Sequence, residues 1–106
     1  EHRMADASSN PYTATAAVLQ AALLGVDNGY ELPAMETGDG FETTDATEST
    51  ATSLAGAIAD LQADTALTRA VGQGLCDNHI FMKEQEVEKT RDLQGEALRD
   101  FYVYFV

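Results

Sequence analysis

A carboxylate and a guanidinium stand two residues apart at the start of the chain, at Glu1 and Arg3. In a β-strand both side chains would project from the same face, roughly 6.5–7 Å apart. At that spacing a carboxylate can bind a hard divalent cation while the arginine contacts a phosphate held by that cation. These are the groups that phosphoryl transfer requires. The spacing alone is common in proteins, so an exposed ion pair at the end of a strand is the competing interpretation.

A second pair with possible chemistry is Cys76 and His79, which are spaced as two zinc ligands can be. A zinc site needs three or four protein ligands, and the only other histidine is His2. Nucleophilic catalysis by the same pair would need a third group to orient the histidine, and the sequence identifies none. We therefore interpret Cys76 as a residue of the packed interior.

An acidic segment occupies residues 31–52, where carboxylates stand among threonines and glycines without any lysine or arginine. The acids of this segment are Glu31, Glu36, Asp39, Glu42, Asp45 and Glu48. Calcium-binding loops place their ligands at a regular alternating spacing, which is absent here. The composition predicts a long solvent-exposed loop rather than a metal site.

Composition restricts the class of protein. The 106 residues carry a net charge of −12, which excludes nonspecific nucleic-acid binding as a main activity because that requires a basic surface. The same charge disfavours anionic membranes, and no apolar run approaches the ~20 residues of a membrane-spanning helix. One cysteine cannot form an internal disulfide and is typical of a reducing compartment. We expect a cytoplasmic protein, with neither nucleic acid nor a membrane as its partner.

The elements that would hold these groups begin with residues 1–9, which show no helical pattern and are expected to end a strand. A helix is predicted over residues 10–28, because Ser9 or Asn10 can cap it and Pro11 suits its first turn. Apolar side chains surround nearly the whole circumference of this helix, which predicts that it is buried on all sides.

The rest of the chain is expected to be helical. Caps at Ser53 and at Asp64 or Thr65 begin helices within residues 53–94, followed by an apolar tail over residues 95–106. The i,i+3 pairs Glu86–Lys89 and Glu88–Arg91 are predicted on the exposed side of the longest helix. The predicted fold class is thus α+β, a mostly helical chain with a strand at its N-terminal end.

The residues from Glu1 to Tyr12 resemble the E-x-R-x-x-D-x-x-x-N-P-Y segment of the glutamine synthetase family. The helix AAVLQAALLGVDNGYELP, the stretch MKEQEVEKTRD and the ending EALRDFYVYFV also resemble segments of that family. The resemblance implies that residues 1–106 are the C-terminal part of a glutamine-synthetase-type catalytic domain, and that truncation explains the missing initial methionine. The remaining metal and nucleotide ligands would lie upstream, so the isolated chain is expected to be inactive.

Roles for two residues follow from the same resemblance. Glu1 matches a ligand of one of two divalent cations, Mg²⁺ or Mn²⁺, beside the γ-phosphate of ATP. Arg3 matches an arginine that contacts the transferring phosphate and the substrate glutamate. The implied reaction, in nitrogen metabolism, phosphorylates the glutamate γ-carboxylate and then lets ammonia or an amine displace phosphate.

Three points stay open. Ala5 and Ala7 stand where many glutamine synthetases have proline, and His2 is expected to point away from Glu1 and Arg3, so the acceptor amine is undefined. The family resemblance implies a homo-oligomer, a dodecamer of two rings, with the tail docked in a partner subunit. The alternative is a small acidic helical module for oligomerisation or partner binding, without catalysis.

Overall fold

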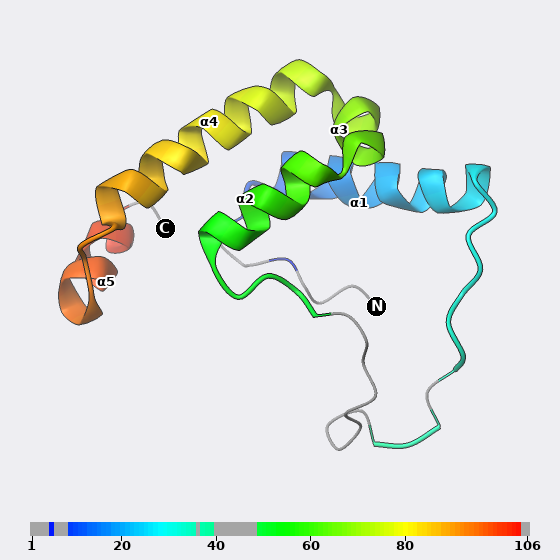
Figure 1. Ribbon diagram of the computed structural model, residues 1–106, viewed down its shortest axis with the longest axis horizontal. Coiled ribbons are helices and arrows are strands. Elements are labelled where there is room, and N and C mark those ends of the chain that lie inside the picture. Colours follow the sequence, from blue (N-terminus) through cyan, green and yellow to red (C-terminus); the bar gives the residue numbers. More distant parts are fainter. Residues whose placement is uncertain (1–4, 6–8, 36, 40–48, 105–106) are drawn as a thin grey trace.

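The computed structural model describes residues 5, 9–35, 37–39 and 49–104. Its regular elements are five α-helices (Figure 1). In chain order they are α1 (Pro11–Asp27), α2 (Leu54–Ala63), α3 (Thr65–Val71), α4 (Gln73–Thr90) and α5 (Gly95–Val103). None of the helices in the described part is long and apolar enough to cross a membrane.

The prediction of an α+β fold is wrong. All regular structure in the described residues is helical, and Ala5 and Ser9, the described members of the first nine residues, lie in bends instead of a strand. A strand satisfies its backbone N–H and C=O groups only across a ladder with a second strand. The described part of the chain provides no such partner, whereas each helix satisfies its own backbone.

The predicted helix starts are confirmed for the first three helices. Asn10 caps α1, with Pro11 in the first turn. The hydroxyl of Ser53 accepts a hydrogen bond from the Gly56 amide, and the carboxylate of Asp64 accepts one from the Leu67 amide. These caps satisfy backbone donors that have no partner inside their own helix, which is why such short segments begin where they do.

Helix α4 is the longest helix in the described part of the chain. It begins at Gln73 and ends at Thr90. Gly72 supplies the carbonyl that accepts hydrogen bonds from the Leu75 and Cys76 amides, so the first turn forms without a side-chain cap.

The small core lies where α2, α3 and α4 meet. Its buried side chains are Ile58, Thr68, Cys76 and Ile80. Helix α1 packs against α3 and has no buried residue within the described chain (Figure 1). The radius of gyration is 16.3 Å, compared with about 13 Å for a compact domain of this length. The chain is therefore more open than a compact domain of the same length.

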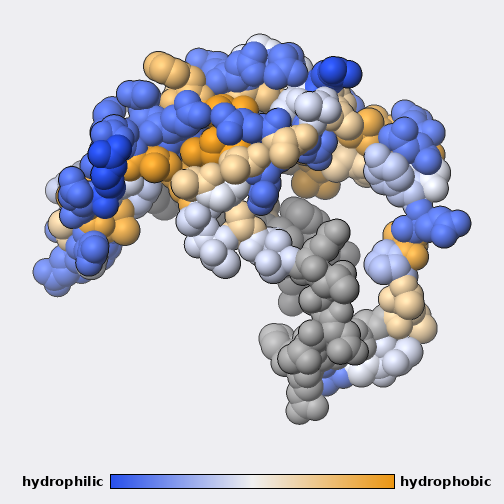
Figure 2. Space-filling view, viewed as in Figure 1, coloured by the Kyte–Doolittle hydropathy of each residue, from blue (hydrophilic) through white to orange (hydrophobic). Residues whose placement is uncertain are grey.

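A large apolar surface is exposed on α1 and on the residues that follow it. Leu19 and Leu23 are more than half exposed, and Val26 is 78% exposed. The described residues that follow, 30–35, lead away from the helices without regular structure (Figure 1). Figure 2 shows apolar surface running along the helices beside strongly polar residues. Burial of α1 by other parts of a larger domain stays a prediction.

The acidic segment is only partly described. Glu31 and Asp39 are exposed and lie outside regular structure, as a solvated loop would place them. Glu36, Glu42, Asp45 and Glu48 lie outside the described residues.

Candidate functional site

The two residues that the sequence assigns to chemistry, Glu1 and Arg3, lie outside the described residues. Their roles as metal ligand and phosphate contact therefore stay predictions. What the structure does describe is the turn that follows them, from Ser9 into the first turn of α1, and the helices packed beside that turn.

The entrance to α1 is held by three hydrogen bonds centred on Asn10. Its side-chain oxygen accepts from the Tyr12 amide at 3.0 Å and from the Thr13 amide at 3.4 Å. The Thr13 hydroxyl donates to the Asn10 carbonyl at 3.1 Å. Pro11 fixes its own φ in the helical range, so the direction in which the chain enters α1 is closely determined.

Loss of this cap should loosen the first turn of α1. In the protein that carries this segment, Asn10→Ala should speed hydrogen exchange at the amides of residues 12–14 roughly fivefold, the equivalent of about 1 kcal/mol. Asn10→Ser is the matched control, because serine caps nearly as well and should leave exchange close to wild type. Equal exchange in the alanine and serine variants would show that the cap does not hold this turn.

A groove of about 670 Å³ lies beside this entrance. Ser9 and Asn10, just before α1, line it together with Thr13 of the first turn, and α4 lines it with Asn78, His79 and Lys83. The remaining lining residues are mainly apolar: Ala14, Ala17, Leu61, Leu67, Val71, Leu75, Cys76 and Met82. The turn at Ser9 and Asn10 thus lines the same groove as Asn78, His79 and Lys83 of α4.

Cys76 and His79 are one helical turn apart on α4 and both line this groove. Cys76 is 5% exposed, which confirms its interpretation as a packing residue, whereas His79 is exposed. Nowhere in the described ranges do three His, Cys, Asp or Glu side chains gather as a metal site requires.

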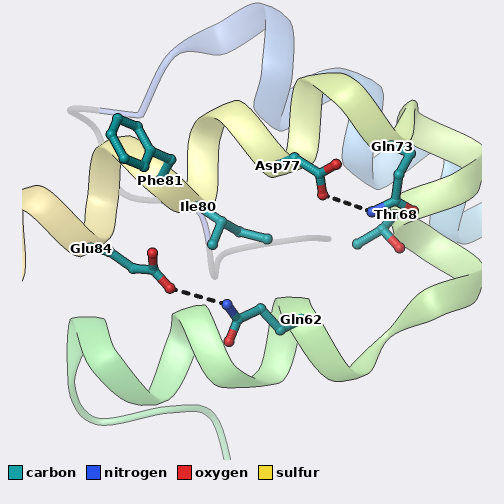
Figure 3. A pocket seen from close by; sticks show the side chains of 7 residues that line it. All are labelled: Gln62, Thr68, Gln73, Asp77, Ile80, Phe81 and Glu84. Carbon is teal, nitrogen blue, oxygen red and sulfur yellow. Dashed lines mark hydrogen bonds between the residues drawn. The ribbon is translucent and has the colours of Figure 1, made fainter.

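A second, smaller cleft of about 240 Å³ separates α2 from α4 (Figure 3). The Gln62 amide donates to Glu84 at 3.2 Å across the cleft, and Gln73 donates to Asp77 at 2.8 Å along α4. Figure 3 shows Ile80 projecting between these two pairs. Each carboxylate already has an amide partner, and the Gln62–Glu84 hydrogen bond links α2 to α4 across the cleft.

Sequence reasoning missed a third cluster, at the junction of α4 and α5. Glu86 was predicted to pair with Lys89, but its carboxylate accepts hydrogen bonds from Lys83 and from the Tyr102 hydroxyl, each at 2.8 Å. The predicted Glu88–Arg91 pair is confirmed. The available signal was the spacing of Leu98, Phe101 and Tyr102, which turns Tyr102 towards the interior side of the last helix.

This cluster shifts two pKa values. Burial raises the pKa of Glu86, but the hydrogen bonds from Lys83 and Tyr102 and the positive charges of Lys83 and His79 outweigh it, so the pKa lies below the usual 4.5. Burial is also the largest influence on Tyr102, and with the hydrogen bond and the charge of Glu86 it raises the pKa of the phenol above 10.0. Near neutral pH the carboxylate is therefore ionised and the phenol keeps its proton.

Comparison with protein families matches residues 1–102 to the glutamine synthetase catalytic domain. The match includes the Glu1-x-Arg3 segment, the capped entrance of α1 and nearly all of the helical region described above. No solved structure matches the chain. Because the match covers almost the entire sequence, this chain belongs to the glutamine synthetase family, within its catalytic domain.

Proposed function

We propose that this chain is the C-terminal portion of a catalytic domain that joins glutamate to ammonia or a small amine at the expense of ATP. The observation that carries the proposal is the family match over residues 1–102, which includes both Glu1 and Arg3. The capped entrance of α1 at Asn10 lies within the same matched range. The proposal rests on the family match and needs no strand at the N-terminal end.

The reaction has two steps. The glutamate γ-carboxylate attacks the γ-phosphorus of ATP, the bond to the bridging oxygen of ADP breaks, and γ-glutamyl phosphate forms. The nitrogen of ammonia or an amine then attacks the acyl carbon, phosphate leaves with the electron pair of the C–O bond, and the nitrogen loses a proton. Both steps concentrate negative charge on oxygens, which a guanidinium aimed at them stabilises.

Two residues of this chain would take part directly. Arg3 would donate hydrogen bonds to the transferring phosphate and to the glutamate, and so align them. Glu1 would supply one carboxylate oxygen to Mg²⁺ or Mn²⁺, a ligand type that both hard cations accept. When bound, the cation would offset charge on the phosphate oxygens.

The oligomeric state and the location in the cell are part of the same proposal. Membership of the family supports a cytoplasmic homo-oligomer of two rings. In this assembly the tail over residues 95–106 would dock in a partner subunit. In support, Val103 and Tyr104 of the tail and one face of α1 are exposed apolar or aromatic surfaces of the kind that a soluble monomer rarely leaves open.

An assay of the intact protein tests the reaction. Phosphate release from ATP should require both glutamate and an acceptor, read in parallel with ammonia, methylamine, ethanolamine and a polyamine. The acceptor that gives the highest kcat/KM identifies the amine. Release that is independent of glutamate, or absent with every acceptor, would refute the ligase assignment.

The isolated 106-residue chain should form no amide from ATP, glutamate and any of these acceptors. It should also fail to sediment as a compact monomer, because α1 has no buried residue and only four described side chains are buried. Measurable turnover would contradict the proposal. A compact monomer or stable small oligomer would instead favour the non-catalytic oligomerisation module, for which the exposed leucines of α1 are the supporting observation.

A further inference from the structure

The last turn of α1 is closed by Asn28 and Gly29. The side-chain amide of Asn28 donates to the Leu24 carbonyl at 2.8 Å, and its backbone amide donates to the same oxygen at 3.0 Å. Gly29 has a φ of +61°, and its amide donates to the Val26 carbonyl at 3.2 Å. These bonds satisfy carbonyls at the end of the helix that have no partner further along it.

The same two residues can react with each other. The Gly29 nitrogen attacks Asn28 Cγ and loses its proton, the Cγ–Nδ2 bond breaks, and ammonia leaves. Water then opens the succinimide ring at either carbonyl, which gives aspartate or isoaspartate. The two steps consume only water. Glycine favours the first step, because it has no side chain to hinder the approach of its nitrogen.

The two other asparagines of the chain are poorly placed for this reaction. Asn10 precedes Pro11, whose nitrogen carries no hydrogen and so cannot form the ring in the same way. Asn78 lies inside α4, where the following backbone amide belongs to the hydrogen bonds of the helix. The residue after Asn78 is His79, whose side chain hinders the approach. Reaction is therefore expected at Asn28 alone.

In the closed turn both reacting groups of Asn28–Gly29 are already hydrogen-bonded, so the turn must open before they can meet. Opening is easy, because Asn28 is exposed and α1 has no buried residue in the described part of the chain. We propose that Asn28–Gly29 is a site of spontaneous deamidation, and that the last turn of α1 controls its rate. The inference does not depend on the proposed reaction.

Deamidation would in turn weaken the end of α1. A carboxylate cannot donate, so the Leu24 carbonyl loses its side-chain partner. The new negative charge lies at the C-terminal end of the helix dipole, beside Asp27 and with no basic residue in the last turn. Isoaspartate also adds a carbon to the backbone, which displaces the Gly29 amide from its position. The passage from α1 into the acidic segment is thereby loosened.

Ageing of the full-length protein in mildly alkaline buffer tests the site, with peptide mass spectrometry to count conversion of each asparagine to an acid. Conversion should accumulate at Asn28 and stay at background at Asn10 and Asn78. It should proceed roughly fivefold faster in protein unfolded in urea, the effect of losing the hydrogen bonds of the turn. Asn28→Gln keeps an amide but would need a larger ring, so this variant should stay unconverted.

Hydrogen–deuterium exchange tests the consequence. Asn28→Asp reproduces the product with an ordinary backbone, and exchange at the amides of residues 28–30 should rise roughly tenfold. Exchange over residues 54–90 should stay at the wild-type rate. Asn78→Asp is the matched control, because it makes the same change of charge at an exposed position of α4. It should leave residues 28–30 unaltered.

Three outcomes would overturn the proposal. Conversion at Asn28 that does not exceed conversion at Asn78 in the full-length protein would show that Asn28–Gly29 is not a deamidation site. Equal rates in folded and urea-unfolded protein would show that the turn of α1 does not control the reaction. Unchanged exchange at residues 28–30 in Asn28→Asp would show that the side-chain amide does not hold the turn.

Discussion

Replacing Arg3 by lysine should lower kcat/KM of the intact ligase by on the order of a hundredfold to a thousandfold. Lysine keeps the positive charge but presents a single ammonium, whereas arginine can bind two oxygens at once in a fixed plane. If Arg3 contacts both the transferring phosphate and the glutamate, lysine can satisfy only one of them. The loss should fall mainly on kcat, because the charge that Arg3 meets is greatest in the transition state.

Arg91→Lys is the control for this change. Arg91 is exposed and pairs with Glu88 on the surface of α4, so the same substitution there should leave both kinetic constants near wild type. Steady-state phosphate release separates the two variants. If Arg3→Lys leaves kcat/KM unchanged, then Arg3 does not take part in the reaction, even though the wild-type enzyme is active.

Glu1→Gln should weaken divalent-cation binding and lower turnover by about a hundredfold at a fixed, subsaturating Mg²⁺ concentration. The amide has nearly the shape of the carboxylate but no charge, so it is a poorer ligand for a hard cation. Raising the Mg²⁺ or Mn²⁺ concentration should restore part of the activity. Titration of Mn²⁺ by electron paramagnetic resonance measures binding directly, without reference to turnover.

Glu31→Gln is the control, since Glu31 is an exposed acid in the segment after α1. It should leave both the cation titration and turnover unchanged. A normal Mn²⁺ titration for Glu1→Gln would exclude Glu1 as a ligand. A weaker Mn²⁺ titration with normal turnover would show that Glu1 binds the cation but that this binding does not limit catalysis.

The features predicted most successfully were those set by neighbours along the chain. The helix starts at Asn10, Ser53 and Asp64 follow from side chains that reach backbone amides two or three residues away. The end of α1 is equally local, with Gly29 at a φ of +61° where the sequence places Asn28–Gly29. Such contacts form whatever surrounds the helix, so the sequence suffices to locate them.

The partner of Glu86 shows where local reasoning stops. Lys83 and Lys89 both stand three residues away, and spacing along one helix cannot choose between them. The choice depends on α5, which brings the Tyr102 hydroxyl to the other carboxylate oxygen. The pKa shifts of both residues depend on this contact across 16 positions of sequence.

The family was determined by the sequence itself, because the match over residues 1–102 uses no coordinates. The roles of Glu1 and Arg3 were likewise inferred from the sequence alone, and they stay predictions. The sequence also led to a strand that the structure does not support, since a strand exists only with a partner and residue types cannot supply one. Only the tertiary structure decided which side chains meet in the groove beside Asn10 and at Glu86. Those contacts depend on how separate helices pack, and packing is a property of the whole described chain.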